Sequence, residues 1–480
     1  MDAPRPIERI FDRRSVLRAS AASLALLGLG SRSPALARAA DRVLEQLAAS
    51  GDDPLAPRPP HHRPRARRMI VLFMHGGPSQ VDTFDYKPLL QRDDGKPLPF
   101  GKPRVTFAET GNLLGSPWRF AQHGECGAHV SELFPHVATQ VDRLCFVKSM
   151  HGSNDAHGGA LLKIHTGSDT FVRPSLGSWV VFGLGTENRS LPGHVTICPT
   201  LGHGGVQNWS AAFLPGATQG VPIGNASIPS KRAEFQHLRH PTLARADQAE
   251  WLDLLRGMNE EHLAAREEDR ELRARLESFA LAYRMQDQAP ETMDLGGESA
   301  ATLQRYGIDE PHTENFGRQC LMARRFIERG VRFVQCTHSY KWDQHDNLKN
   351  GHETNAREVD RPIAGLLGDL AARGLLEDTL VLWIGEFGRT PVAQGKDGRD
   401  HNPHGWTVWL AGGGCKPGHS HGATDDYGYY ATVDKVHVHD LHATILWALG
   451  LDHERLTFRY AGRDFRLTDV AGNVVHGILS

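Results

Sequence analysis

The sequence predicts an α/β fold in which a mostly parallel central sheet is sandwiched by helices, with one helical excursion. Two observations lead to this fold class. The first is a continuous apolar run over residues 69–74, which has the length of a strand and suits one buried on both faces of a parallel sheet. The second is a repeated order of helix, glycine and strand, which is typical of right-handed βαβ units.

The individual elements follow from these two patterns. The predicted strands are short runs rich in apolar residues and cover residues 69–74, 331–336, 379–384 and 407–411. The predicted helices each stop at a glycine and cover residues 315–329, 356–373 and 440–449. Because each of the first two helices is followed directly by a strand, they are expected to be crossovers between parallel strands.

A charged helical stretch over residues 241–285 separates the two halves of this alternation. Its apolar residues Leu272, Leu276, Phe279 and Tyr283 recur at helical spacing and form one stripe, while glutamate and arginine fill the other faces. We therefore expect an amphipathic excursion that packs on the core and binds no cofactor.

Three segments are predicted: a twin-arginine signal peptide over residues 1–37, a Pro/Arg-rich linker without core packing over 38–68, and one domain over 69–480. In the signal, Arg13 and Arg14 precede an uncharged, Ala/Leu-rich stretch at 21–30 and an A-x-A cleavage pattern that ends at Ala37. The chain is therefore expected to be exported by the twin-arginine translocase to the periplasm or the cell exterior. The alternative is an ordinary amphipathic N-terminal helix that carries two arginines.

Composition limits the partners. The net charge of −2, from 54 Lys and Arg against 56 Asp and Glu, predicts no nucleic-acid partner. The apolar part of the signal is shorter than the ~20 residues that span a bilayer, and no later segment is long enough, so no stable membrane span is expected. The 27 histidines favour metal binding. The six cysteines show no C-x-x-C spacing, which argues against a zinc finger or a thioredoxin-like motif.

Carboxylates and imidazoles follow the predicted strands or lead into them. Because ligands of open α/β sheets bind outside the carboxyl ends of the strands, and divalent metals accept mixed oxygen and nitrogen ligands, we predict a metal site there. Its predicted ligands are His75, Asp343, His345, Glu386, Asp400 and His401. Any one Asp–His pair could simply brace a turn; their recurrence at successive strands favours the metal site.

A second polar loop, over residues 151–159, leads into a predicted helix. Ser153 or His157 could place a nucleophile in the positive field of the helix N-terminus, or the loop could only cap the helix through its Ser, Asn or Asp. The two interpretations are equally favoured by the sequence. There is no G-x-S-x-G elbow and no phosphate-binding loop motif.

Several motifs together resemble a known family. They are His75-Gly76-Gly77-Pro78-Ser79, Trp342-Asp343-Gln344-His345, Gly385-Glu386-Phe387-Gly388-Arg389, Gly398-Arg399-Asp400-His401 and Gly462-Arg463-Asp464-Phe465. With them the chain, from about residue 69 to its C-terminus, resembles a large family of exported bacterial proteins that is catalogued as a domain of unknown function. That family is grouped with the alkaline phosphatase and sulfatase superfamily. The resemblance implies an alkaline-phosphatase-like core with divalent metals at the carboxyl ends of its strands.

The chain also departs from the sulfatase pattern. Glu386-Phe387 stands in place of an Asp-Asn or Asp-His metal pair, and His75 stands where aspartate is common. His157 occupies about the place of the sulfatase nucleophile. Because no Cys-x-Pro-Ser-Arg motif is present, a formylglycine mechanism is not expected.

The resemblance implies an exported, metal-dependent hydrolase of phosphate or sulfate esters, with zinc, manganese or calcium as cofactor and a small-molecule or glycan ester as substrate. His157 or Ser153 would lie near the attacking group, and Arg389 would hold the anion. The alternative is a non-catalytic extracytoplasmic binding or surface-assembly protein that keeps the fold. A redox protein is less favoured because no haem, flavin or iron–sulfur motif is present.

Overall fold

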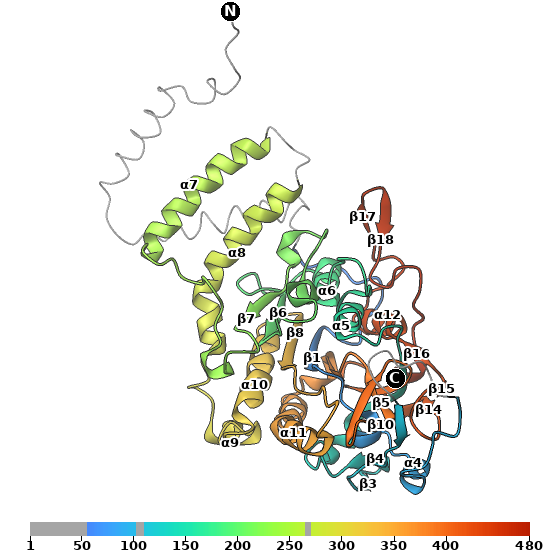
Figure 1. The fold of residues 1–480 in the computed structure, drawn as a ribbon. Helices are drawn as coiled ribbons and strands as arrows, with labels where there is room; N and C mark the ends of the chain where they lie inside the picture. Colours follow the sequence, from blue (N-terminus) through green and yellow to red (C-terminus); the bar gives the residue numbers. More distant parts are fainter. Residues whose placement is uncertain (1–54, 102–109, 265–269) are drawn as a thin grey trace, which may run out of the picture. The chain divides into compact units, whose positions relative to one another are not determined.

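The structure, a computed structural model, describes residues 55–101, 110–264 and 270–480, without the side chains of residues 260–277. The predicted signal peptide lies outside the described residues. The centre of the fold is a nine-stranded sheet in the order β13-β5-β12-β9-β1-β8-β6-β7, with β16 also paired to β5 (Figure 1). The predicted α/β class with a mostly parallel central sheet is confirmed.

Of the nine strands in this sheet, β12 alone runs against the others. Five neighbours are parallel: β9 (Thr379–Ile384), β1 (Arg68–Met74), β8 (Phe333–His338), β6 (His194–Ile197) and β7 (Val221–Ile223). The others are β12 (Trp406–Ala411), β5 (Leu144–His151), β13 (His419–His421) and β16 (Val436–His437). Within this sheet β12 runs against its neighbours β9 and β5, whereas β13 and β16 run parallel to β5.

The direction of β12 follows from the segment before it. Between β9 and β12 the chain forms an antiparallel hairpin, β10 (Gly388–Gln394) and β11 (Gly398–Asn402), rather than a helix. A parallel return to the sheet requires a crossover of a dozen or more residues, usually helical. The predicted strand at 407–411 is confirmed, but it is not part of a parallel βαβ unit.

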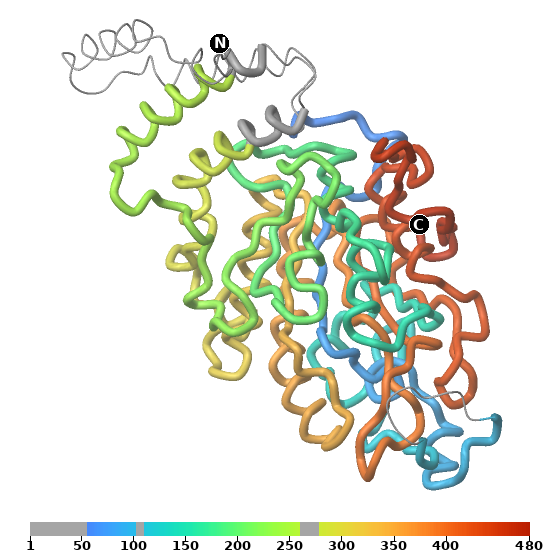
Figure 2. Tube along the Cα trace, turned by 45° about the horizontal axis from the view of Figure 1, so that its top comes forward, coloured from blue at the N-terminus to red at the C-terminus, as the bar shows by residue number. Residues whose placement is uncertain are grey.

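Helices cover both faces of the sheet. Along β1, Ile70, Leu72 and Met74 belong to one buried core, whereas Met69 and Phe73 belong to the other. The first core packs α10 (Glu314–Glu328) and α11 (Leu348–Ala372); the second packs α5 (His157–Thr166), α6 (Leu176–Leu184) and α12 (Val438–Ala448). The strand itself, blue in Figure 2, runs between the two layers. The predicted helices are confirmed, with α11 starting eight residues earlier than the predicted 356.

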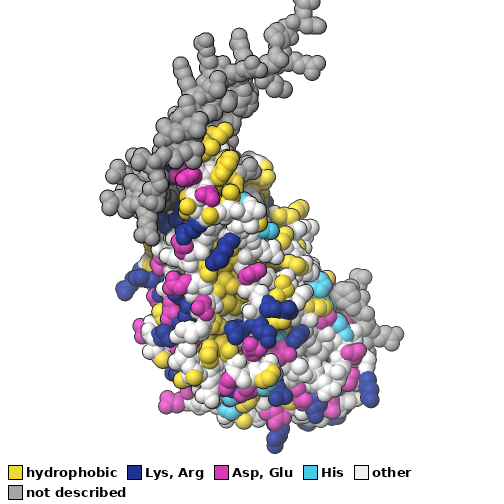
Figure 3. Space-filling model, turned by 90° about the vertical axis from the view of Figure 1, so that its left-hand side faces the viewer, with side chains coloured by type: hydrophobic (Ala, Val, Ile, Leu, Met, Phe, Trp, Pro, Cys, Tyr) yellow, Lys and Arg dark blue, Asp and Glu magenta, His cyan; other side chains and the backbone are white. Residues whose placement is uncertain are grey.

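The predicted excursion consists of α7 (Arg245–Ala264) and α8 (Arg270–Met293). Its packing face differs from the predicted stripe. The side chains of Leu272 and Leu276 lie outside those described. Phe279 is 49% exposed, whereas Leu281, Met285 and Ala289 are buried, so in the described part of α8 the face that packs is rotated from the expected one. Exposed hydrophobic side chains on this side of the molecule appear yellow in Figure 3. Among the described residues, no helix combines the length and apolarity needed to cross a bilayer.

Residues 55–67 differ from the linker that was expected. Leu55 and Ala66 are buried, and the backbone amides of His61 and Arg65 donate to the carbonyl oxygens of Gly450 and Ala448. Because its backbone groups pair with the end of α12, this Pro/Arg-rich segment runs along the domain despite its composition.

Candidate metal centre

Ionisable side chains gather at the carboxyl ends of three adjacent parallel strands. His75 follows β1, Glu386 follows β9, and the segment after β8 carries Asp343. The β10–β11 hairpin and the first turn of α5 reach the same edge of the sheet through contacts with these residues. This is the edge at which ligands of open α/β sheets bind.

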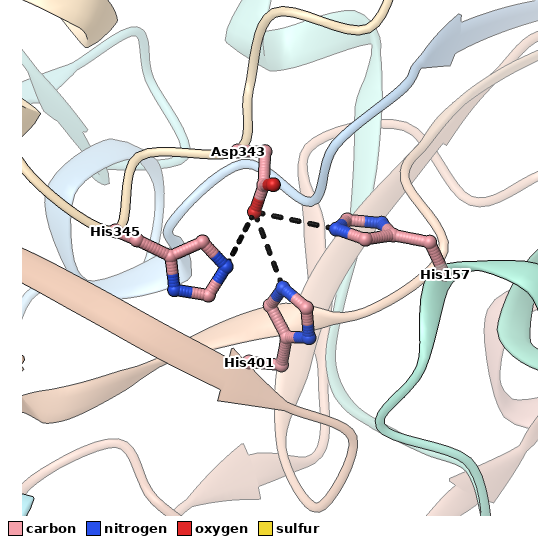
Figure 4. Close-up of side chains that lie close together, drawn as sticks. All are labelled: His157, Asp343, His345 and His401. Atoms are coloured by element: carbon pink, nitrogen blue, oxygen red, sulfur yellow. Dashed lines mark hydrogen bonds and ion pairs between the residues drawn. The ribbon is translucent and has the colours of Figure 1, made fainter. Parts of the chain in front are cut away.

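Four side chains at this edge converge in a group that we call the four-residue centre (Figure 4). They are His157, Asp343, His345 and His401. Their common point is Oδ1 of Asp343, which lies 3.0 Å from Nε2 of His345 and 3.1 Å from Nε2 of His401. The same oxygen lies 3.3 Å from Nε2 of His157, a buried nitrogen that makes no hydrogen bond.

The environment of His401 fixes the position of its ring proton. Its Nδ1 lies 2.6 Å from the backbone carbonyl oxygen of Asp155, and because a carbonyl only accepts, the proton of the neutral ring is on Nδ1. Burial lowers the pKa of His401, an effect that its contact with Asp343 only partly offsets, so the ring is neutral at pH 7. Nε2 therefore directs a lone pair at the carboxylate of Asp343, an arrangement that a cation between the two atoms would stabilise.

The other two imidazoles of the centre are oriented in the same way, but their pKa values shift in the opposite direction. Burial lowers the pKa of His157, but its contacts with Asp343 and Glu386 more than offset this and raise it. Contact with Asp343 raises the pKa of His345. Nδ1 of His157 lies 2.7 Å from Oε1 of Glu386, and Nδ1 of His345 bonds to Oε1 of Gln394. In each case the outer nitrogen meets an oxygen acceptor and Nε2 faces the centre. Imidazoles that bind metals characteristically donate their second ring N–H to a carboxylate or carbonyl in this way.

Asp343 is ionised and has more neighbours than its lone pairs can serve. Burial raises the pKa of Asp343, but its contacts with the three imidazoles more than offset this and hold the pKa well below its ordinary value. Its Oδ1 also accepts from Nη2 of Arg389 at 2.6 Å. Four nitrogens thus surround one carboxylate oxygen, which has about two lone pairs to offer.

The donor set of the four-residue centre fits a divalent metal. Three imidazole nitrogens and one carboxylate oxygen are the ligand types that zinc accepts, and bonds of about 2.0–2.1 Å in a tetrahedron place ligands about 3.3 Å apart. The distances of 3.0, 3.1 and 3.3 Å from the oxygen to the three nitrogens are close to this value. All four ligand atoms lie within 4.8 Å of one another.

His75 and Glu386 form a second group of ligand-type side chains beside His157. His75 is fully buried, its Nδ1 has no hydrogen-bond partner, and its Nε2 is 3.9 Å from Oε1 of Glu386. Burial lowers the pKa of His75 to about 4. Burial raises the pKa of Glu386, but His157 and His75 reverse this and bring the pKa to about 2. The pair is therefore a carboxylate and a neutral imidazole, which also group with His157 as metal-ligand types.

Two side chains beside this pair were not predicted from the sequence. His203 stacks on His157, with 5.1 Å between ring centroids, and its Nδ1 is 3.4 Å from Nε2 of His75. Tyr340 packs 4.7 Å from His75 and its hydroxyl bonds to Oδ2 of Asp343. Both side chains are exposed. His203 belongs to the loop after β6, whose short, partly polar sequence does not predict a strand, so no strand end in the sequence points to this histidine.

Arg389 does not lie where it could hold a substrate anion. Its side chain is fully buried, Nε donates to the carbonyl oxygen of Gly77, and Nη1 donates to that of Arg399. Nη2 donates to Asp343 and to the carbonyl oxygen of Trp342. The guanidinium therefore holds the loop that carries Asp343, through the carbonyl oxygen of Trp342, and pairs with the carboxylate of Asp343.

Two further predicted site residues lie at the edge of the centre or outside it. Ser153 is exposed and its hydroxyl bonds to Asp169 at 3.4 Å, so the structure does not bring it to the four-residue centre. Asp400 is buried, accepts the backbone N–H of His401 at 2.8 Å, and has its Oδ1 3.8 Å from Nδ1 of His345. It is a neighbour of two imidazoles rather than a member of the group.

The sequence of the chain was compared with protein families and with curated proteins. A family model described as a protein of unknown function (DUF1501) matches residues 66–479. No curated protein matches the sequence.

Several solved structures resemble the chain. It is similar to the lipoteichoic acid synthase LtaP from Listeria monocytogenes, with 8% identity, a TM-score of 0.34, and coverage of 88% of this chain and 80% of that one. It is similar to the PsFucS1 sulfatase from Pseudoalteromonas sp., with 12% identity, a TM-score of 0.33, and coverage of 88% and 73%. It is also similar to the alkaline phosphatase from the Antarctic bacterium TAB5, with 10% identity, a TM-score of 0.34, and coverage of 81% and 99%. Similarities of this size do not assign a function.

Proposed function

The chain belongs to the family described as a protein of unknown function (DUF1501), and from this premise we propose that it is a divalent-metal-dependent hydrolase of phosphate or sulfate esters. The observation that carries the proposal is the arrangement around Oδ1 of Asp343. Three imidazoles aim Nε2 at this one oxygen, and each has its outer nitrogen bonded to an acceptor. Such a set serves a cation better than it serves a hydrogen-bond network.

The metal would be held by His157, Asp343, His345 and His401. With three nitrogen ligands this set favours zinc or manganese over calcium, which prefers oxygen ligands. Four protein ligands fill a tetrahedron, so catalysis would require the ion to accept a fifth ligand, at which position it would polarise the ester oxygens and lower the pKa of a water molecule.

The chain's own residues would orient this centre. Glu386 holds the ring of His157 through Nδ1, and the carbonyl oxygen of Asp155 holds that of His401. Arg389 balances the charge of Asp343. Tyr340 and His203, which are exposed beside the centre, are the side chains best placed to meet the substrate.

Metal analysis followed by turnover assays tests the proposal. We expect stoichiometric zinc or manganese in the purified protein and hydrolysis of an aryl phosphate or aryl sulfate, both lost in Asp343→Ala. The matched control is Asp346→Ala, which removes an exposed carboxylate from the same loop and should keep metal and activity. A wild-type protein that takes up neither metal, or that binds metal without hydrolysing either ester class, contradicts the proposal. In the latter case the non-catalytic binding protein becomes the better description.

We also propose export by the twin-arginine route to the periplasm or cell exterior, on the strength of Arg13, Arg14 and the cleavage pattern that ends at Ala37. Replacing both arginines by lysine should leave uncleaved precursor in the cytoplasm. The N-terminus of the exported protein should be Arg38. Export that is unaffected by the double replacement would point to another secretion route.

A further inference from the structure

The loop that carries Asp343 is tied to the core by three side chains outside the four-residue centre. Nε1 of Trp342, the residue before Asp343, donates to Nδ1 of His338 at 2.9 Å. Nε2 of His338 lies 2.7 Å from Oε2 of Glu358, on α11. Trp342 is fully buried and His338 is 3% exposed, so solvent does not compete for the bond between them. The Glu358 side chain is 22% exposed, and its Oε2 also pairs with Nζ of Lys341 at 2.6 Å.

The direction of this chain of bonds is unambiguous. An indole N–H can only donate, so Nδ1 of His338 is the acceptor. The proton of the neutral ring is then on Nε2, and Glu358 accepts it. Burial raises the pKa of Glu358, but His338 and Lys341 more than offset this, so the carboxylate stays ionised. The bonds therefore run from Trp342 through His338 to a charged acceptor, which strengthens them.

The opposite side of the loop packs against the backbone of His75 and Gly76, the residues that follow β1. The backbone amide of Trp342 donates to the carbonyl oxygen of His75 at 3.2 Å. Gly76 has φ +118°, and a Cβ there would lie 2.6 Å from the backbone nitrogen of Asp343. The loop is therefore held on one side by the backbone at Gly76 and on another by the Trp342–His338–Glu358 chain, while Arg389 bonds to Asp343 and to the carbonyl oxygen of Trp342.

We propose that Glu358, acting through His338 and Trp342, is a positioning residue that sets the Asp343 carboxylate within the four-residue centre. The inference rests on the proposed function in treating Asp343 as a metal ligand. It adds a residue that touches none of the four ligands and yet determines the geometry of the site.

Cobalt titration of the metal-free full chain tests this through the visible absorption bands of bound Co²⁺, which report ligand geometry. Loss of a partner bonded directly to a ligand typically lowers metal affinity by about 10–100-fold. Because Glu358 acts through two further side chains, we expect a loss of no more than about 10-fold, with shifted bands, in Glu358→Ala. Glu358→Gln keeps an acceptor for His338 and should restore both. Arg357→Ala, at the exposed neighbouring position on α11, is the matched control and should behave as wild type. Trp342→Phe removes the N–H donor and replaces the buried indole by a smaller aromatic ring. It should reproduce the shifted bands and serves as the test if Glu358→Ala does not fold.

A second measurement separates failure of this inference from failure of the proposed function. The imidazoles of His345 and His401 both contact the carboxylate of Asp343. In metal-free protein, their ¹⁵N resonances therefore report the position of Asp343. They should move in Glu358→Ala and Trp342→Phe and stay in place in Arg357→Ala. If wild type binds no Co²⁺ but these shifts occur, the metal proposal fails and the positioning role stands. If folded Glu358→Ala and Trp342→Phe keep wild-type resonances and wild-type Co²⁺ binding, the positioning role is overturned.

Discussion

His401 directs its unprotonated nitrogen at the carboxylate of Asp343, 3.1 Å away, because its other ring nitrogen donates to the carbonyl oxygen of Asp155. A backbone carbonyl cannot exchange roles with the ring, so the tautomer is set by the main chain and not by a titratable partner. The centre is therefore organised as a ligand set before any cation enters it, which lowers the cost of ordering on binding.

The first prediction follows from this relationship. His401→Gln removes a nitrogen ligand, so zinc affinity should fall by more than the roughly 10–100-fold that loss of an outer-shell partner costs. Competition with a chromogenic chelator measures the change. His404→Gln, three residues along and with its ring 5.5 Å from that of Tyr430, is the control and should bind zinc as wild type does. Equal affinity in both variants would show that His401 is not a ligand.

Much of the fold could be predicted because its signals are local. The run at 69–74 became β1, and Gly330, Gly374 and Gly450 do follow the ends of helices. The strand at 194–197 was not predicted, since His194-Val195-Thr196-Ile197 is short and partly polar. Because His203 lies in the loop after this strand, the sequence pattern does not place it at a strand end.

The composition of the candidate site was more predictable than the roles within it. Ligand-type residues at strand ends could be found because parallel strands share one edge. Whether a carboxylate faces the centre or supports it depends on side-chain direction, which spacing along the chain does not specify. Glu386 thus turns out to hold Nδ1 of His157, and Arg389 to lie beneath Asp343.

The buried position of Arg389 predicts a structural effect of its loss. Arg389→Met leaves several carbonyl oxygens without a donor and takes the guanidinium away from Asp343, which keeps its bond from Tyr340. Removing one partner of a buried charge pair typically costs about 3–5 kcal/mol. The free energy of unfolding, measured by chemical denaturation, should fall by that amount. Arg119→Met removes a guanidinium whose side chain is 91% exposed and should change little. Unchanged stability together with weaker substrate binding would instead support an anion-holding Arg389.

The cysteines predict a simple labelling pattern. All six are free, five are buried, and Cys126 is exposed. A thiol reagent should therefore modify one cysteine per native chain quickly and all six after denaturation. Cys126→Ser should abolish the fast reaction. Rapid modification of a second thiol in native protein would mean that one of the buried positions opens readily.

Stability should decline in acid through buried histidines, of which His352 is a clear case. Burial lowers the pKa of His352 to about 3, and its Nε2 accepts the backbone N–H of Ser79. Because the folded pKa lies below the unfolded value of about 6.5, the unfolded chain binds the extra proton, and stability falls as pH drops from 6.5 toward 3. Between pH 7 and pH 5 this residue should cost roughly 2 kcal/mol of unfolding free energy. His352→Gln, whose amide oxygen can accept from Ser79, should lose that part of the pH dependence, whereas His237→Gln at an exposed position should retain it. Parallel pH profiles for wild type and His352→Gln would show that His352 does not remain neutral in the folded protein.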